Sequence, residues 1–296
     1  MKKPKIVVIG SINMDLVTQT NTIPKVGETV LGEDFMTAPG GKGANQAVAA
    51  AKLGGDVTLL GCVGDDAFGS ELMKHLHKQG VDTKHIQTIS NTSSGVAAIT
   101  LSEGDNSIIV VPGANHKLTP VLVQQHEQLI TDADIVLLQL EIPLDSVVKA
   151  AELARKHNVP VILNPAPMQE LPKKLILQST YLTPNEHELE SLLSSTNLSQ
   201  KETEALKAKS IVTRGSKGIQ LQQEGVEQLI SGYQVDVVDS TGAGDTFNGA
   251  LALSLSSGLS LLEASQFANA AAALSVTKLG AQSGMPTKKE VESFLH

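Results

Sequence analysis

Short apolar runs recur along the chain, and each run ends in small or polar residues. Between these runs lie segments whose apolar residues have helical spacing. The alternation predicts a mostly parallel central sheet with helices on both faces, a three-layer α/β/α fold. The predicted strands are residues 5–9, 57–60, 135–140, 159–163, 180–182 and 210–213, and the predicted helices are residues 45–53, 70–79, 144–157 and 187–194.

Two stretches interrupt this alternation, residues 15–37 and 95–111. The second has two apolar runs around Glu103-Gly104-Asp105-Asn106, which is typical of a β-hairpin, and the first has strand-like pieces around Gly27 and Gly32. We therefore predict a single domain over residues 1–296 with a small β appendage. A few strands alone bury little surface, so the appendage should serve as a lid, as a homodimer surface, or as both.

Composition and charge exclude several functional classes. The net charge of −8 and the absence of a basic cluster argue against nucleic-acid partners, and no apolar run is long enough to span a membrane. With Cys62 as the single cysteine and no secretion-signal pattern, we expect a cytoplasmic enzyme. The histidines lack zinc-site spacing, Phe247 replaces the third glycine of a dinucleotide fingerprint, and Gly43 replaces the Ser or Thr of a P-loop.

The most informative segment is Gly242-Ala243-Gly244-Asp245. It separates an apolar run, predicted as a strand over residues 235–238, from a predicted helix that begins at Asp245. Backbone N–H groups at such a helix start bind anions, and the acid could accept a proton from an attacking hydroxyl, which together suit phosphoryl transfer. For this aspartate taken alone, a helix cap is the more common explanation.

Other predicted strand ends are also rich in polar groups. Asn13 and Asp15 follow the first strand, Glu141 follows another, and the turn Gly40-Gly41-Lys42-Gly43-Ala44-Asn45-Gln46 opens a helix. Carboxylate, amide and ammonium groups are suitable partners for a polyhydroxylated ligand, because each sugar hydroxyl both donates and accepts. Ordinary turn chemistry and a solvated lysine are the alternative explanations.

Two further segments suit phosphates. Asn185 and Glu188 could hold Mg²⁺ through water, although they also fit a capping box. The segment Thr213-Arg214-Gly215-Ser216-Lys217-Gly218 offers hydroxyl, backbone N–H and cationic groups to phosphate oxygens, or is simply an exposed turn.

Taken together, these motifs resemble the PfkB carbohydrate kinase family. The resemblance rests on SINMD at residues 11–15, GGKGANQAVAAAKLG at 40–54, TPNEHE at 183–188, TRGSKG at 213–218 and DSTGAGDTFNG at 239–249, and it extends to FANAAAALSVTKLGAQ at 267–282. DSTGAGD is highly specific for the family. GGKGANQA with SINMD points to members that act on ribose rather than on adenosine or fructose.

The resemblance implies that ATP phosphorylates the O5 hydroxyl of D-ribose, with Mg²⁺ as cofactor. Asp245 would be the base, and Gly242, Ala243 and Gly244 would form an anion hole. The residues implied to hold the sugar are Asn13, Met14, Asp15, Gly40, Gly41, Lys42, Gly43, Asn45, Glu141 and Asp245. Those implied to organise the nucleotide and its Mg²⁺ are Asn185, Glu188, Thr213, Arg214, Gly215, Ser216, Lys217, Gly218, Gly244 and Asn269.

A potassium ion that activates the enzyme is implied as well. Its ligands would be Asp239 and Thr241, with the backbone carbonyls of Ser275, Lys278 and Gly280. The family commonly has a serine a few residues after GAQ, where this chain has Gly284 preceded by Ser283. That side-chain oxygen is therefore missing, or Ser283 or water supplies it, and Gly284 itself is kept among the candidate ligands.

Two alternatives stay open at this point. One is a kinase of the same family that acts on another sugar or on a nucleoside. The other is a non-catalytic regulator that binds sugar or nucleotide, which we would expect to have lost the acid or the glycines that this chain retains.

Overall fold

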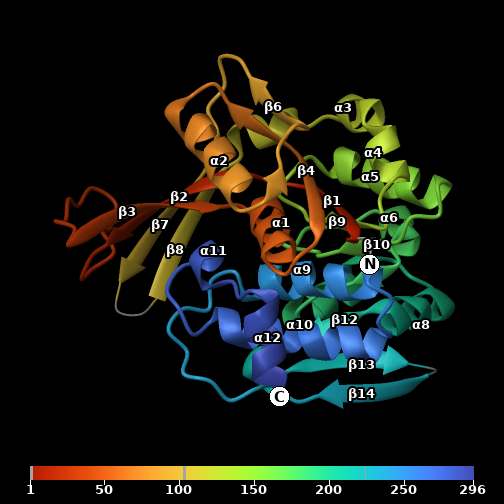
Figure 1. The fold of residues 1–296 in the computed structure, drawn as a ribbon. Coiled ribbons are helices and arrows are strands. Elements are labelled where there is room, and N and C mark those ends of the chain that lie inside the picture. Colours follow the sequence, from red (N-terminus) through yellow and green to blue (C-terminus); the bar gives the residue numbers. More distant parts are fainter. Residues whose placement is uncertain (1–2, 103–104, 224) are drawn as a thin grey trace.

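A parallel sheet forms the centre of the molecule (Figure 1). The computed structural model describes residues 3–102, 105–223 and 225–296. The strand order is β11-β10-β9-β1-β4-β5, β6 also pairs with β4, and every pairing is parallel. The strands are β1 (Lys5–Ile9), β4 (Asp56–Gly64), β5 (Val81–Asp82), β6 (Ile86–Ile89), β9 (Ile135–Leu138), β10 (Val161–Leu163) and β11 (Tyr181–Leu182).

The sheet is buried on both faces, because successive residues of each strand enter different cores. Ile6 and Val8 belong to one apolar cluster, whereas Val7 and Ile9 belong to the other. Such strands read as continuous apolar runs in a sequence, which is why the runs at residues 5–9, 57–60, 135–140, 159–163 and 180–182 predicted parallel strands correctly. The predicted strand over residues 210–213 lies in a separate antiparallel sheet instead.

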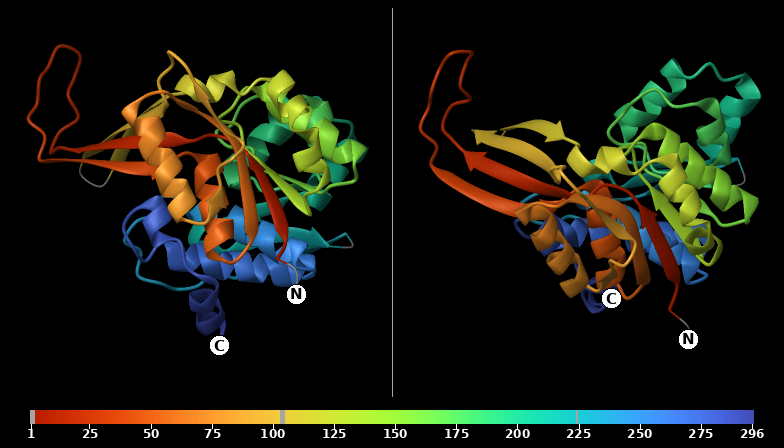
Figure 2. Two further views of the ribbon diagram at one scale, coloured as in Figure 1. Left: turned by 45° about the horizontal axis from the view of Figure 1, so that its top comes forward. Right: turned by 90° about the horizontal axis from the view of Figure 1, so that it is seen from above.

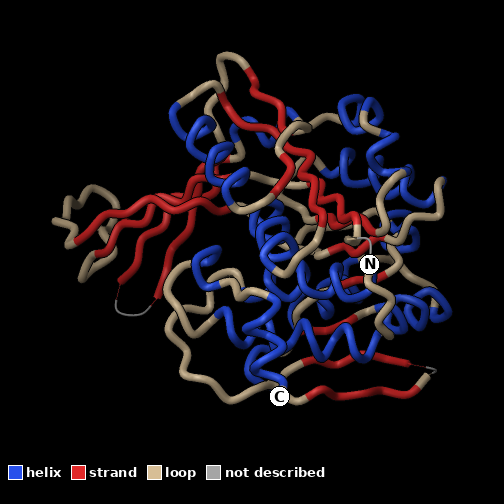
Figure 3. The backbone as a smooth tube through the Cα atoms, in the orientation of Figure 1, coloured by secondary structure: helices blue, strands red, loops and turns tan. Residues whose placement is uncertain are grey.

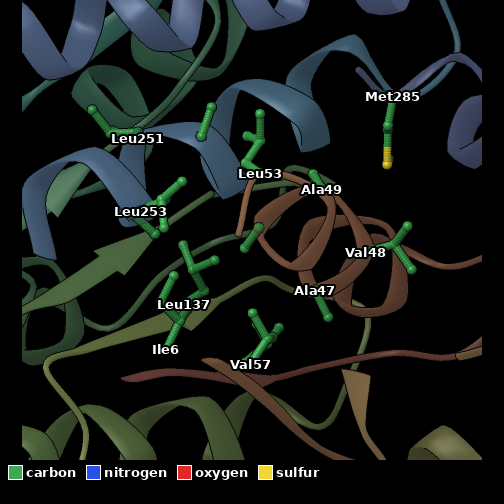
Figure 4. Close-up of a cluster of buried hydrophobic side chains, with 14 of the residues drawn as sticks. Ile6, Ala47, Val48, Ala49, Leu53, Val57, Leu137, Leu251, Leu253 and Met285 are labelled. Carbon is green, nitrogen blue, oxygen red and sulfur yellow. The ribbon is translucent and has the colours of Figure 1, made fainter. Parts of the chain in front are cut away.

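Helices cover both faces (Figure 3). One layer contains α1 (Lys42–Lys52), α2 (Ala67–Lys78), α9 (Ala243–Ser256), α10 (Leu261–Ser275) and α12 (Lys288–Leu295). The other contains α3 (Pro120–Gln125), α4 (Glu127–Thr131), α5 (Leu144–Lys156), α6 (Lys173–Gln178), α7 (Glu186–Ser195) and α8 (Gln200–Lys209). Figure 4 shows the first layer against the sheet, with side chains of α1 and α9 beside Ile6, Val57 and Leu137.

The β appendage is a separate sheet that projects from the body (Figures 1 and 2). It consists of β2 (Asn13–Gln19), β3 (Asp34–Gly40), β7 (Gly95–Ser102) and β8 (Asp105–Val111), in the order β3-β2-β7-β8. The prediction of strands around Gly27 and Gly32 is wrong, because both glycines lie in the loop that joins β2 to β3. The predicted turn residues Glu103 and Gly104 lie outside the described residues.

A small antiparallel sheet completes the fold. It contains β12 (Ile211–Thr213), β13 (Ile219–Gln223) and β14 (Val226–Ile230). Isolated parallel bridges, Leu182 with Ser210 and Asn185 with Thr213, attach it to the edge of the central sheet. The remaining elements are the short helices η1 (Gly113–Lys117), η2 (Gly215–Lys217) and α11 (Ala281–Gly284). Among the described residues, no helix is long and apolar enough to cross a membrane.

The predicted strand over residues 235–238 is not observed. This segment is an extended loop, and the backbone N–H groups of Val238 and Asp239 donate to the Val276 carbonyl at the end of α10. The helices that follow the two glycine-rich turns also begin earlier than predicted, α1 at Lys42 and α9 at Ala243.

Candidate active site

The side chain of Asp245 lies in the first turn of α9 and is 7% exposed. Its Oδ2 accepts a hydrogen bond from Nδ2 of Asn45 at 2.9 Å, and its Oδ1 accepts one from Nε2 of Gln46 at 3.1 Å. Both donors belong to α1. The N-cap of α9 is Gly242, and no side chain caps this helix, so the helix-cap explanation for Asp245 is wrong.

The glycine turn before Asp245 is shaped for close approach by a ligand. Gly242 has φ +78°, and a Cβ there would lie 2.8 Å from Cβ of Ala281, so another residue would be strained. A Cβ on Gly244 would meet nothing within 4 Å, because Gly244 lines open pockets. N–H groups in the first turn of a helix have no intrahelical acceptor, so those of Gly244 and Asp245 suit an anion.

The Glu141 side chain is fixed at the start of helix α1. Its Oε2 accepts from the hydroxyl of Ser11 at 2.5 Å and from the backbone N–H of Lys42 at 3.1 Å. The carboxylate therefore holds the end of β1 and the beginning of α1 together. Gly41 is the N-cap of this helix, and Gly43 lies in its first turn.

Asp15 lies on β2 next to the chain at Gly40. A Cβ on Gly40 would lie 2.3 Å from Oδ2 of Asp15, so this position needs glycine for the carboxylate to fit. Asn13, two residues earlier on the strand, is 2% exposed and its Oδ1 accepts from Nδ2 of Asn115 at 2.7 Å. Met14 lies between them, and its side chain is buried in the hydrophobic core.

The charges of the site influence one another. Burial, together with the charges of Glu141 and Asp245, raises the pKa of Asp15 to about 7. Burial lowers the pKa of Lys42, but the carboxylates of Asp245, Glu141 and Glu188 raise it more, so the net direction is upward. One ammonium group thus faces several carboxylates, an arrangement suited to a ligand with many hydroxyls and a transferring phosphate.

Two adjoining pockets meet at the glycine turn. The smaller, of about 180 Å³, is polar, and Lys42, Asn164, Glu188, Asp245 and Asn248 are among its lining residues. The larger, of about 290 Å³, has a mainly apolar lining that includes Tyr233, Val235, Val237, Phe247 and Val276. Thr213, Ser240, Ala243 and Gly244 line both. The pair can hold a polar group at Asp245 and a flat apolar group beyond it.

The segment that follows β12 contributes to the larger pocket only in part. Thr213, Gly215, Ser216 and Gly218 line it, whereas Arg214 forms an ion pair with Glu186 at 2.8 Å and neither Arg214 nor Lys217 lines either pocket. Asn269 also lines the larger pocket, and its Nδ2 donates to the Ser231 carbonyl at 2.9 Å.

Asn185 and Glu188 form a capping box at the start of α7. Oδ1 of Asn185 accepts from the N–H of Glu188, and Oε2 of Glu188 accepts from the N–H of Asn185, both at 2.8 Å. The same residues line the polar pocket. Burial raises the pKa of Glu188, while its bond to Asn185 and the charge of Lys42 act in the opposite direction.

The residues implied for a monovalent cation also come together. Oδ1 of Asp239 accepts from the N–H of Thr241 at 2.9 Å, and Oδ2 accepts from the N–H of Gly280 at 2.8 Å. A Cβ on Gly284 would lie 2.4 Å from the Ser275 carbonyl oxygen and 3.4 Å from that of Lys278. The Ser283 hydroxyl donates to the Leu279 carbonyl at 2.6 Å. The carbonyl oxygens of Ser275 and Lys278 therefore both lie near Gly284, while the Ser283 hydroxyl is bonded elsewhere.

Sequence reasoning missed the groups that support the site. Gln46 and Ser11 both lie inside recognisable motifs, but the sequence pattern assigns neither of them a role. In the structure Gln46 donates to Asp245, and Ser11 donates to Glu141. Thr183 donates to Oδ1 of Asn248 at 2.7 Å, and Nδ2 of Asn248 donates to the Gly244 carbonyl at 2.8 Å. Among the described residues, no group of three or more His, Cys, Asp or Glu side chains gathers to hold a metal ion.

The fold and the site together define a kinase, and comparisons with known proteins agree. The model of the pfkB family carbohydrate kinases matches residues 3–288, so the chain belongs to this family. Ribokinase of Bacillus subtilis is 48% identical over 98% of this chain and 99% of its own length, and ribokinase of Haemophilus influenzae is 42% identical over 97% of both. The structure of Arabidopsis thaliana ribokinase complexed with ribose and ATP is 36% identical, covers 99% of both chains and superimposes with a TM-score of 0.90.

The shifted pKa of Asp15 can be measured by carboxyl ¹³C NMR. We expect a midpoint near 7 in the ligand-free protein and a lower one in Glu141→Gln, because the charge of Glu141 raises the pKa. The exposed variant Glu28→Gln should leave the midpoint unchanged. Since the folded pKa exceeds the usual 3.8, this group makes the free energy of unfolding fall as pH rises through about 4 to 7. An Asp15 midpoint near 4 would contradict this account of the site.

Proposed function

We propose that this chain transfers the γ-phosphoryl group of ATP to the O5 hydroxyl of D-ribose, which gives ribose 5-phosphate and ADP. The observation that carries this proposal is Asp245, held by two amides at the junction of a polar and an apolar pocket. The curated ribokinases of comparable length support ribose as the sugar. We further propose that the protein works in the cytoplasm.

Asp245 acts as the base in this mechanism. The substrate oxygen forms a bond to the γ-phosphorus, the bond from that phosphorus to the β–γ bridging oxygen breaks, and the hydroxyl proton passes to Asp245. The loose transition state of phosphoryl transfer needs positioning and charge stabilisation more than a strong base, so an ordinary aspartate suffices. First-turn N–H groups of α9 stabilise the charge on the transferring group.

The remaining residues bind and orient. Asn13, Asp15, Lys42 and Glu141 hold the sugar hydroxyls, and Asn45 acts mainly through Asp245, since its Nδ2 is bonded there. The apolar pocket takes the adenine beside Asn269. Asn185 and Glu188 would hold Mg²⁺ through water, and this ion would neutralise phosphate charge.

We also propose a potassium ion beside Gly284. The carbonyl oxygens of Ser275 and Lys278 that face this glycine support it, as does Asp239, which lies near the start of the anion-binding turn. Gly284 brings no side-chain oxygen, so water completes the shell. The ion would stiffen the turn that precedes α9.

The appendage is proposed to act as a lid of the single domain and as a homodimer surface. It exposes large apolar side chains on both faces: Phe35 and Ile109, which are 60% and 67% exposed, share one face, and Met36 and Ile108, which are 42% and 51% exposed, share the other. Soluble monomers rarely expose this many large apolar side chains together, and a second copy of the same sheet would cover them.

Asp245→Asn should lower kcat for ribose by about 10²- to 10⁴-fold and leave the KM for ATP nearly unchanged, because only the proton acceptor is lost. Asp236→Asn, an exposed aspartate of the preceding loop, is the control. ADP release should be measured with ribose, 2-deoxyribose, fructose and adenosine, since a deoxyribokinase of Salmonella typhi is 37% identical. Wild-type turnover by Asp245→Asn would refute the base, and a preference for another substrate would refute ribose.

The potassium ion can be tested by exchanging cations at constant ionic strength. The rate of ADP release should be higher in potassium than in sodium, because Na⁺ is too small to reach all the carbonyl oxygens beside Gly284 without distortion. Equal rates in the two buffers would show that this chain does not need the ion.

Light scattering after size exclusion should give twice the chain mass of 31.1 kDa. Ile108→Asp and Ile109→Asp place a charge on opposite faces of the appendage, so the variant whose face forms the interface should become monomeric. A monomeric wild type would overturn the dimer, and two variants that both stay dimeric would overturn the appendage as its interface.

A further inference from the structure

A row of hydrogen bonds runs from helix α2 to Asp245. The Nε2 atom of His75 lies 2.8 Å from Oε1 of Gln282, and Nε2 of Gln282 donates to Oδ1 of Asn45 at 2.9 Å. Nδ2 of Asn45 then donates to Oδ2 of Asp245 at 2.9 Å. The residues come from four separate helices, α2, α11, α1 and α9.

The direction of every hydrogen bond in this row follows from the carboxylate of Asp245, at which the row ends. A carboxylate only accepts hydrogen bonds, so Asn45 must turn its NH₂ group toward Asp245 and its oxygen toward Gln282. Gln282 must then turn its own NH₂ group toward Asn45 and its oxygen toward His75. His75 must therefore donate, and its Nε2 carries a proton.

The row is fixed at its centre as well as at its ends. Gln282 and Asn45 are 5% and 6% exposed, so little water competes for their amides. The ammonium group of Lys52 donates to the backbone carbonyls of Gln282 at 2.8 Å and Met285 at 2.9 Å. The backbone that carries Gln282 is thus tied to the end of α1, the helix that also carries Asn45.

The other oxygen of Asp245 is held in the same way. Gln46 donates to Oδ1, and Oε1 of Gln46 accepts from Nε2 of Gln139 at 2.6 Å. Each amide that donates to the carboxylate is thus held by another amide: Asn45 by Gln282, and Gln46 by Gln139. A rotation of the Asn45 amide by half a turn would place its oxygen against the carboxylate, and the NH₂ group of Gln282, which donates to that oxygen, opposes the rotation.

We propose that Gln282 and His75 are positioning residues for Asp245. They hold the Asn45 amide in the one orientation that donates to the carboxylate, and so keep the lone pairs of Asp245 directed at the substrate hydroxyl. His75, half-buried on α2, is the outer end of the row. The kinetic consequence rests on the proposed function, whereas the bond directions do not.

Kinetics of His75 variants test the proposal. His75→Leu removes the donor and should lower kcat with ribose about five-fold, the effect of roughly one neutral hydrogen bond, with the KM for ATP unchanged. His75→Gln keeps an NH₂ group near the place of Nε2 and should restore kcat to within about two-fold. The control is His77→Leu, an exposed histidine on the same helix, which should match the wild type.

Two results would overturn the proposal. One is a kcat for His75→Leu equal to that of His77→Leu. The other is equal loss in His75→Leu and His75→Gln, which would indicate helix packing rather than donation. The thermal unfolding of each variant should be measured beside the kinetics. If His75→Leu and His75→Gln lose stability equally as well as kcat, the role of His75 is in helix packing and the proposal fails.

The tautomer of His75 gives a readout that needs no activity. Long-range ¹H–¹⁵N NMR spectra at about pH 8, where a histidine is mostly neutral, should show the proton on Nε2, with the signal assigned by its absence in His75→Gln. A proton on Nδ1 would overturn the row even if the enzyme phosphorylates ribose. If ribose were not the substrate, an Nε2 proton would still support the row.

Discussion

The contact between helices α1 and α9 is the constraint on which the site depends. Both helices begin at glycine-rich turns, and a Cβ on Gly249 of α9 would lie 2.7 Å from Cβ of Ala49 and from the Gln46 carbonyl oxygen. This close packing brings Asp245 within hydrogen-bonding distance of Asn45 and Gln46, which lie about 200 positions away in the sequence. Asp245 and the glycine turn before it thus become parts of one rigid unit with α1.

Such packing also explains how the protein tolerates its buried carboxylates. An unpaired buried charge is costly, and each acid here has identifiable partners: the amides of α1 for Asp245, and the Ser11 hydroxyl with the Lys42 N–H for Glu141. Asp15 is the exception, and its pKa of about 7 is the result.

Much of the architecture could be predicted because the central strands are buried on both faces and therefore read as unbroken apolar runs. The same signal failed at residues 235–238, where Val235 and Val237 line a pocket instead of pairing in a sheet. It failed again around Gly27 and Gly32, because loop glycines between β-branched residues look like strand ends. Apolar patterning indicates that a residue avoids water, but not which neighbour covers it.

In the site, too, some residues could be predicted from the sequence and others could not. Local pattern could not tell a helix cap from a base at Asp245, and only the convergence of other motifs favoured the base. For Asn185 and Glu188, by contrast, the local explanation was right, since a capping box and a pocket lining coexist there. Gln46, Asn115 and Gln282 act through partners about 100 to 240 positions distant, and no spacing rule links such pairs. A sequence thus reveals the groups that touch a ligand more readily than those that orient them, because the first cluster in motifs and the second are defined only by packing.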